Sequence, residues 1–368
     1  MQASFDHIRQ AFATARQPAQ DQAQAGPARH RDIAAQLDLS EGELIAAHCG
    51  EFAAGESPLQ ARRLREEWSL LIESLEPLGE LMALTRNESC VHEKVGVYAH
   101  ASTQHGVALV LGGAIDLRVF YAQWAHGFAV AERLADGAIQ RSLQFFDPAG
   151  QAVHKIFLRP GTEVAAFESL VGVFLAEDQQ AGIELGAAWS DAAEKLDAEV
   201  DVAAFREAWA SLRDTHEFFG MLKRFGVSRT QALRLADAGF VQPLAAASAQ
   251  ELLSRAAQEA VPLMCFVGNP GMIQIHSGPV KRVAVMGPWL NVLDPGFNLH
   301  LREDHIASAW LVRKPTSDGL VCSLELFDAR QQLIAQFFGE RKPGQAERCD
   351  WRELLESLTD TTPLEAAC

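Results

Sequence analysis

The sequence lacks most of the short motifs that would assign a chemistry directly. It contains no Gly-x-Gly-x-x-Gly fingerprint, no phosphate-binding loop and no nucleophile elbow, so no flavin or nicotinamide site is expected. Its six cysteines include no Cys-x-x-Cys pair, which predicts reduced thiols in a cytosolic protein. The scattered histidines have no zinc-site spacing: His92, His126, His276, His300 and His305.

Positive charge and long apolar runs are also scarce. The net charge is −16, so the surface should repel nucleic acid and anionic membranes, and an anionic ligand would need a local basic pocket. No run reaches the roughly 18 apolar residues of a membrane-spanning helix, and the first residues contain no signal-peptide core. We therefore expect a cytoplasmic protein with no membrane span. The length of 368 residues predicts about two domains.

An internal duplication is the strongest positive feature of the chain. After a shift of 182 residues the sequence matches itself, and one deletion at the Asp136-Gly137 turn restores the match with a shift of 181. The matched pairs include Leu81 with Leu263, Asn87 with Asn269, Gly96 with Gly278, Leu117 with Leu299, Val130 with Val312, Ser142 with Ser323 and Phe157 with Phe338. A period this long predicts two similar lobes and excludes a short-repeat solenoid.

The pattern of strand and helix signals predicts an α+β fold. Short β-branched and aromatic segments from residue 81 onwards, with a hairpin at Asp147-Pro148, indicate a large antiparallel sheet in each lobe. We predict an N-terminal helix and flexible linker (residues 1–30), a first lobe (31–180), a helical linker (181–255) and a second lobe (256–368). Residues 60–75 are predicted to be one helix, as are residues 202–225.

His216 is the first candidate for chemistry. It fills a gap in the apolar stripe of the predicted helix at 202–225, with two aromatic residues beside it in THEFF. A neutral imidazole in an apolar wall is what a haem iron needs as an axial ligand. A core histidine bonded to a backbone carbonyl is the alternative.

Charged residues supply two further candidates. Arg229, Lys314 and Arg341 could pair with ligand carboxylates, although each could equally be a solvated surface charge. Strand alternation places Asp116 and Arg118 on one face, so Arg118 either pairs with Asp116 or reaches over a bound ligand. The segment at residues 223–236 has helix-turn-helix punctuation, but the acidic composition argues against nucleic-acid binding.

Several longer motifs together resemble the HemS-type haem-trafficking and haem-degrading proteins of bacterial haem uptake. They are THEFFGMLKRFGVSRTQAL, NESCVHEKVGVY, IDLRVFYAQW, FVGNPGMIQIHSG, GPWLNVLDPGFNLHLRE and AWLVRKPTSDGLVCSLELFD. The resemblance covers nearly all of the chain after residue 30. It implies two similar lobes of antiparallel sheet with helices, and haem (iron protoporphyrin IX) as the bound group.

The resemblance also implies roles for individual residues. His216 corresponds to the proximal ligand of the haem iron, and Arg118 to the distal arginine, with Phe120 beside the porphyrin. The propionate and pocket contacts fall on Arg229, Phe266, Lys314, Gln336 and Arg341. Some family members have tyrosine where this chain has Phe338, which removes one hydroxyl contact.

Three functions remain open from the sequence. The protein could bind imported haem and deliver it for iron release, with a haem importer and a haem-degrading enzyme or reductase as partners. It could instead be a haem-degrading oxygenase-type enzyme that uses an external reductant. A haem-responsive regulator that binds nucleic acid is the minor alternative.

A secondary haem site at His92 is a further prediction from the duplication. His92 lies where the second repeat has Gln274, while His300 takes the place of Arg118 in that repeat. The competing interpretation is a strand-surface histidine paired with Glu93 or Glu88.

Overall fold

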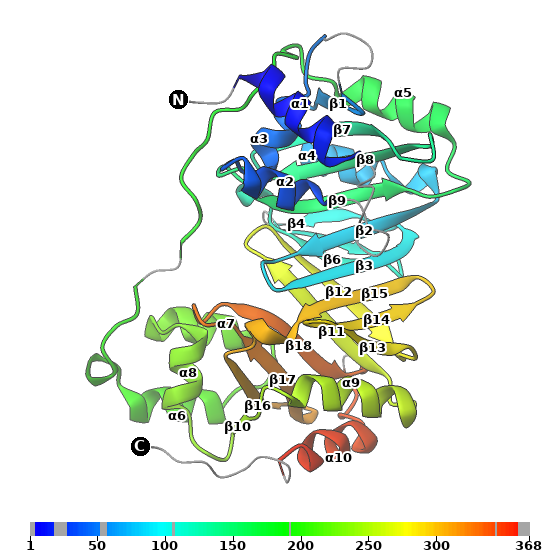
Figure 1. Cartoon of the computed structure of the whole chain (residues 1–368). Coiled ribbons are helices and arrows are strands. Elements are labelled where there is room, and N and C mark those ends of the chain that lie inside the picture. Colours follow the sequence, from blue (N-terminus) through cyan, green and yellow to red (C-terminus); the bar gives the residue numbers. More distant parts are fainter. Residues whose placement is uncertain are drawn as a thin grey trace. The chain divides into compact units, whose positions relative to one another are not determined.

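The computed structural model describes residues 4–17, 28–51, 57–104, 107–190, 193–342 and 344–359. The chain forms two compact units (Figure 1). Unit 1 comprises residues 1–86, 93–189 and 269–274, and unit 2 comprises residues 87–92, 190–268 and 275–368. Of the predicted N-terminal helix and linker (1–30), residues 1–3 and 18–27 lie outside the described residues. Within those residues, no helix is both long and apolar enough to cross a membrane.

The strands form two nine-stranded antiparallel sheets, which confirms the predicted α+β class with an internal duplication. Unit 1 contributes one run of neighbouring strands: β1 (Leu59–Arg63), β7 (His126–Arg133), β8 (Ile139–Phe146), β9 (Ala152–Leu158) and β2 (Glu80–Arg86). Unit 2 contributes the matching run: β10 (Val241–Leu244), β16 (Ser308–Thr316), β17 (Gly319–Phe327), β18 (Leu333–Gly339) and β11 (Leu263–Asn269).

Each unit also carries a smaller set of strands. The set of the first repeat is β4 (Ser102–Gln104), β5 (Val107–Leu111) and β6 (Asp116–Val119), and that of the second is β13 (Val283–Met286), β14 (Trp289–Asp294) and β15 (Phe297–Arg302). The remaining strands are β3 (Cys90–Val97) and β12 (Met272–Gly278). Alternating burial along β2 and β15 matches the period of two that a half-buried strand requires.

The duplication extends to strand register. Val130 lies opposite Ser142 in unit 1, as Val312 lies opposite Ser323 in unit 2. An irregularity in the register occurs at Phe146 and at the matching Phe327. The two repeats therefore have the same pairing, residue for residue, through three strands.

The helices repeat in the same order. Unit 1 contains α1 (Phe5–Ala15), α2 (His30–Gln36), α3 (Glu41–Ala46), α4 (Trp68–Glu73) and α5 (Val164–Phe174). Unit 2 contains α6 (Val202–Ala210), α7 (Glu217–Phe225), α8 (Arg229–Leu235), α9 (Ser248–Gln258) and α10 (Cys349–Ser357). The succession α3-β1-α4-β2 thus corresponds to α8-β10-α9-β11 (Figure 1). Both α3 and α8 begin after a serine N-cap whose hydroxyl accepts a backbone N–H three residues later.

Two predicted helices are wrong in detail. Residues 60–75 contain the end of the strand β1 followed by α4, because residues 59–63 pair with β7. Residues 202–225 form two helices, since α6 ends at Ala210 and α7 begins at Glu217. The second correction moves His216 off the predicted apolar stripe.

Candidate functional site

His216 lies at the N-terminus of α7 and is exposed. Its side chain retains 87% of its accessible surface. The carboxylate of Asp214 accepts hydrogen bonds from the His216 backbone N–H at 2.8 Å and from the ring Nδ1 at 2.6 Å. Because Nδ1 is bonded to Asp214, Nε2 is the ring nitrogen that remains available to coordinate a metal ion.

The pKa of Asp214 is lowered by its contacts with α7. The backbone N–H of His216 is the largest cause, and the His216 ring and Arg341 add to it. Arg341 is therefore electrostatically coupled to the Asp214–His216 pair. Its own guanidinium approaches the Gln345 carbonyl at 3.5 Å.

The predicted cations Arg229 and Lys314 meet at a buried carboxylate that the sequence analysis missed. Glu325 in β17 accepts from Arg229 Nε at 2.6 Å and Nη2 at 3.0 Å, and from Lys314 Nζ at 2.7 Å. Gln336 Nε2 donates to the same carboxylate at 2.9 Å, and Ser323 Oγ at 3.2 Å. We call these five residues the Glu325 cluster.

Burial and neighbouring charge set the protonation of this cluster. Burial would raise the pKa of Glu325, but Arg229 and Lys314 hold it well below its usual value. Burial lowers the pKa of Lys314 to about 8, with Arg229 adding to the effect and Glu325 opposing it. Glu325 is therefore ionised near neutral pH, and Lys314 titrates only slightly above it.

Aromatic rings cover the Glu325 cluster. Phe218 of α7 lies 4.5 Å from Lys314 Nζ and 5.2 Å from the guanidinium carbon of Arg229, measured to the ring centroid. Phe338 lies 5.5 Å from the same ammonium and makes an edge contact with Phe266 at 5.1 Å. The helix that carries His216 therefore also packs on the cations.

Arg118 and Phe120 belong to unit 1. Arg118 donates to Asp116 within β6, and both side chains are partly exposed while Leu117 and Val119 are buried. The strand-face pairing that the alternation predicted is present. Phe120 follows the strand, and its backbone N–H donates to the Gly271 carbonyl at 3.0 Å.

The first repeat holds a charge-reversed counterpart of the Glu325 cluster. The repeat shifts place Glu132 at the position of Lys314, Gln144 at that of Glu325 and Lys155 at that of Gln336. Glu41 opens α3 where Arg229 opens α8, and it forms ion pairs with Lys155 and Arg86.

Glu132 belongs to the same counterpart and connects it to the N-terminal helices. It pairs with Arg16 at the end of α1 and with His30 of α2, whose Nε2 lies 2.9 Å away. The N-terminal segment therefore supplies positive charge at the place where the second repeat has its own lysine. The two repeats share a backbone design but not a charge pattern.

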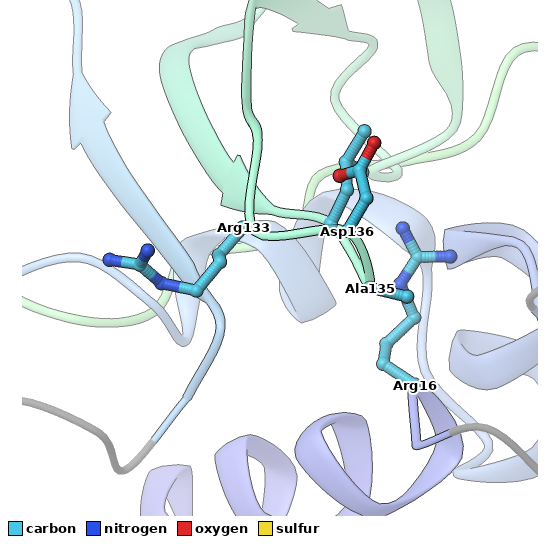
Figure 2. Close-up of a pocket in the computed structure, with 5 residues that line it drawn as sticks. Arg16, Arg133, Ala135 and Asp136 are labelled. Atoms are coloured by element: carbon cyan, nitrogen blue, oxygen red, sulfur yellow. The ribbon is translucent and has the colours of Figure 1, made fainter.

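A cavity of about 300 Å³ lies beside this region of unit 1. It is lined by Arg16, Arg133, Leu134, Ala135 and Asp136. Figure 2 shows the Arg16 side chain extending from α1 toward the turn at Ala135 and Asp136, while the Arg133 guanidinium points away. None of its lining residues is one that the resemblance assigns to haem.

Three of the other histidines pack or hydrogen-bond within the fold. His92 is fully buried, at 0% exposure, with its ring centroid 5.0 Å from that of Phe297. The interpretation of His92 as a surface histidine is therefore wrong, and a haem site there stays a prediction that would need local opening. His276 stacks on the same Phe297, and His300 Nδ1 lies 2.6 Å from Asn291 Oδ1. Among the described residues, no group of three or more potential metal-ligating side chains is arranged around a common point.

Known proteins resemble this chain in sequence and in fold. The hemin transport protein HmuS of Yersinia pestis is 36% identical over 329 residues, which is 89% of this chain and 92% of that protein. The crystal structure of holo-PhuS, a heme-binding protein from Pseudomonas aeruginosa, matches with a TM-score of 0.89 and 45% identity, covering 96% of this chain and 99% of that one.

A third relative has a different described role. The heme degrading enzyme ChuS of Escherichia coli O157:H7 matches with a TM-score of 0.84 and 33% identity over 96% of this chain and 99% of that chain. The family described as "Haemin-degrading HemS.ChuX domain" matches this chain twice, at residues 38–174 and 226–358. The two matches span both repeats, and this chain belongs to the haemin-degrading HemS.ChuX domain family.

Proposed function

We propose that this protein binds haem in the cytoplasm and delivers it for iron release. His216 would be the proximal ligand of the iron, and Arg118 would lie on the opposite face of the porphyrin. The similarity to a hemin transport protein and to a heme-binding protein supports haem as the ligand. A haem importer and a haem-degrading enzyme or reductase would be the protein partners.

The residues of unit 2 fit the ligand chemically. Haem presents an iron that takes an imidazole nitrogen, a flat apolar ring and two carboxylates. The chain offers an exposed His216, aromatic rings at Phe218 and Phe338, and the cations Arg229 and Lys314. Phe219 adds an apolar surface on α7, with 73% of its residue surface exposed.

One observation carries the proposal. The helix α7 holds an exposed imidazole at its N-terminus and, two residues later, packs Phe218 against both Arg229 and Lys314. One helix thus carries the candidate metal ligand and contacts two cations that lie on α8 and β16. Asp214 would hold the His216 ring through Nδ1, which orients Nε2 and raises its basicity toward a metal.

Arg118 would act differently from His216. A guanidinium remains protonated and is a poor iron ligand, so it would hold water or hydroxide at the iron by hydrogen bonding. The ion pair with Asp116 keeps the guanidinium at one position along β6. Phe120 would supply an apolar contact to the porphyrin.

Haem degradation is the second candidate function, because a similar protein is described as a heme degrading enzyme. The two are separated by turnover of the haem-loaded protein in air with an external reductase and catalase present. A delivery protein should leave the porphyrin intact or yield no defined tetrapyrrole when peroxide is scavenged. A defined ring-opened product that requires oxygen under those conditions would make the protein an oxygenase.

Nucleic-acid binding has less support. The two arginines of α8, within the segment that has helix-turn-helix punctuation, are already in ion pairs: Arg229 with Glu325, and Arg234 with Asp197 and Glu194. A salt-dependent gel-shift assay with and without haem would test it. Binding that weakens with salt and responds to haem would revive this function.

A further inference from the structure

Glu325 is already ion-paired with Arg229 and Lys314, the cations that haem carboxylates would contact. Its side chain has 0% exposure, whereas Arg229 retains 24%. An incoming carboxylate can therefore reach Arg229 from solvent, but it meets a guanidinium already bound through Nε and Nη2 to Glu325. Lys314 is buried and bound to the same carboxylate.

The first repeat folds with a neutral residue at the corresponding position of its sheet. Gln144 takes the place of Glu325 in the first repeat, and it is equally buried. Gln144 lies opposite Lys155 in the strand register, as Glu325 lies opposite Gln336. Its amide donates to Ser142 at 3.1 Å, and Ser142 matches Ser323. A neutral amide of the same shape is thus buried at this position, where Glu132 and Lys155 stand in place of Lys314 and Gln336.

The charge balance of the Glu325 cluster follows directly. Arg229 and Lys314 carry two positive charges and Glu325 one negative charge, which leaves one positive charge for a ligand that brings two carboxylates. Any new carboxylate is repelled by Glu325 at close range and must share its donors. Removing the charge of Glu325 would free the Arg229 guanidinium. The pKa of Lys314 would fall without Glu325, which raises it, so Lys314 would take up its proton as a ligand carboxylate binds.

We propose that Glu325 is an internal competitor for the haem carboxylates, which weakens their hold on Arg229 and Lys314 and so permits release. This inference rests on the proposed haem-binding function. The ligand class is a porphyrin carboxylate, and the effect requires no change at the iron. Glu325 would thereby limit retention of the ligand while His216 binds the metal.

Glu325→Gln is the decisive variant, because it reproduces the residue of the first repeat. Haem, iron-free protoporphyrin IX and haem dimethyl ester are titrated into wild type and variant, followed by Soret absorbance or porphyrin fluorescence. We expect both free acids to bind about tenfold or more tighter in the variant, and haem transfer to excess apomyoglobin to slow. The ester should bind equally to both proteins.

Glu132→Gln is the matched control. It neutralises a buried, ion-paired carboxylate at the Lys314 position of the first repeat. Its haem and protoporphyrin affinities should equal those of wild type. A gain of similar size in this control would mean that the effect reflects net charge or stability and not competition at Glu325.

The outcomes separate the inference from the proposed function. If wild type binds neither haem nor protoporphyrin, the proposed function fails. If wild type binds but folded Glu325→Gln binds the free acids no tighter, or gains equally for the ester, Glu325 is not a competitor. If Glu325→Gln does not fold, Glu325→Asp decides: its shorter side chain should give a smaller gain for the free acids alone, and the absence of that gain overturns the inference.

Discussion

Lys314 is a cation whose charge depends on pH close to neutrality. Burial lowers its pKa to about 8. Below that pH it is protonated and can bind a carboxylate, and above it the charge is progressively lost. We therefore predict that haem affinity falls as pH rises from 7 to 9.5, while the affinity for haem dimethyl ester lacks this carboxylate-dependent decline. Soret titrations at each pH would measure both, and parallel profiles for the two ligands would remove Lys314 from the carboxylate site.

Neutralising Lys314 tests the same contact at constant pH. A charge-assisted hydrogen bond contributes about 1.5–3 kcal/mol, so Lys314→Met should weaken haem binding by about tenfold or more. The same change should have a smaller effect on the ester. Lys342→Met is the control, since Lys342 is exposed. Equal losses for haem and its ester in Lys314→Met would contradict the assignment.

Asp214 should support His216 without touching the ligand. Loss of a carboxylate that orients a metal-binding histidine typically costs about 10–100-fold in metal affinity. Because both side chains are exposed, we expect Asp214→Asn to lie near the lower figure, with an altered Soret band. Protoporphyrin IX lacks iron and should bind the variant as it binds wild type. A matching loss for protoporphyrin would show that Asp214 shapes the pocket instead.

At the residue scale the sequence identified the cations but not their partner. Arg229 and Lys314 were candidates from the sequence itself and Gln336 came from the family resemblance. The structure brings all three to Glu325. A signal for Glu325 was available in the duplication, because Glu325 aligns with the neutral Gln144 of the first repeat. The side chains of the Glu325 cluster come from α8, β16, β17 and β18. Their meeting depends on tertiary structure, which the periodicity of a sequence does not predict.

At the scale of elements, the strand signals predicted the sheets more reliably than apolar spacing predicted the helices. Matched strands preserve their register because a slip of one residue would invert every side chain. The helix at 202–225 was overpredicted because apolar spacing continued across Asp214. That residue accepts the backbone N–H of His216, while Glu217 accepts that of Arg213. Local side-chain bonds of this kind start a new helix and override the spacing.

Glu132 should hold the N-terminal helices on unit 1. Burial would raise its pKa, but the His30 and Arg16 contacts lower it. Glu132→Gln leaves Arg16 without its anionic partner, and we predict a loss of about 1–3 kcal/mol in the free energy of unfolding. Backbone amides of α1 should also exchange hydrogen faster than in wild type.

Glu168→Gln provides the comparison for that prediction. Glu168 pairs with Arg62 and Arg141 at a partly exposed position, where ion pairs contribute about 0–1 kcal/mol. Urea unfolding would compare the two variants. If Glu132→Gln were no less stable than Glu168→Gln, the Glu132 contacts would not anchor α1.

At the scale of the whole molecule, two buried histidines should make the protein sensitive to mild acid. Burial lowers the pKa of His48 to about 4 and that of His154 to about 3. The unfolded chain has histidine pKa values near 6.5 and so binds more protons than the folded chain between these limits. Stability is therefore present above about pH 6.5 and falls as pH decreases.

Each histidine should cost about 2 kcal/mol of unfolding free energy between pH 7.5 and pH 5. His154→Gln should make the decline shallower, since it removes one of the two groups. Urea unfolding at several pH values measures the slope. An unchanged slope in the variant would mean that His154 is not protonated on unfolding.

The central claim is that this chain binds haem through His216. Haem titration by Soret absorbance on wild type, His216→Ala and the exposed control His7→Ala tests it most directly. The account predicts one tight site in wild type and in His7→Ala, with weakened affinity by at least about tenfold and a changed Soret band in folded His216→Ala. Unchanged affinity and an unchanged spectrum in His216→Ala would contradict the account.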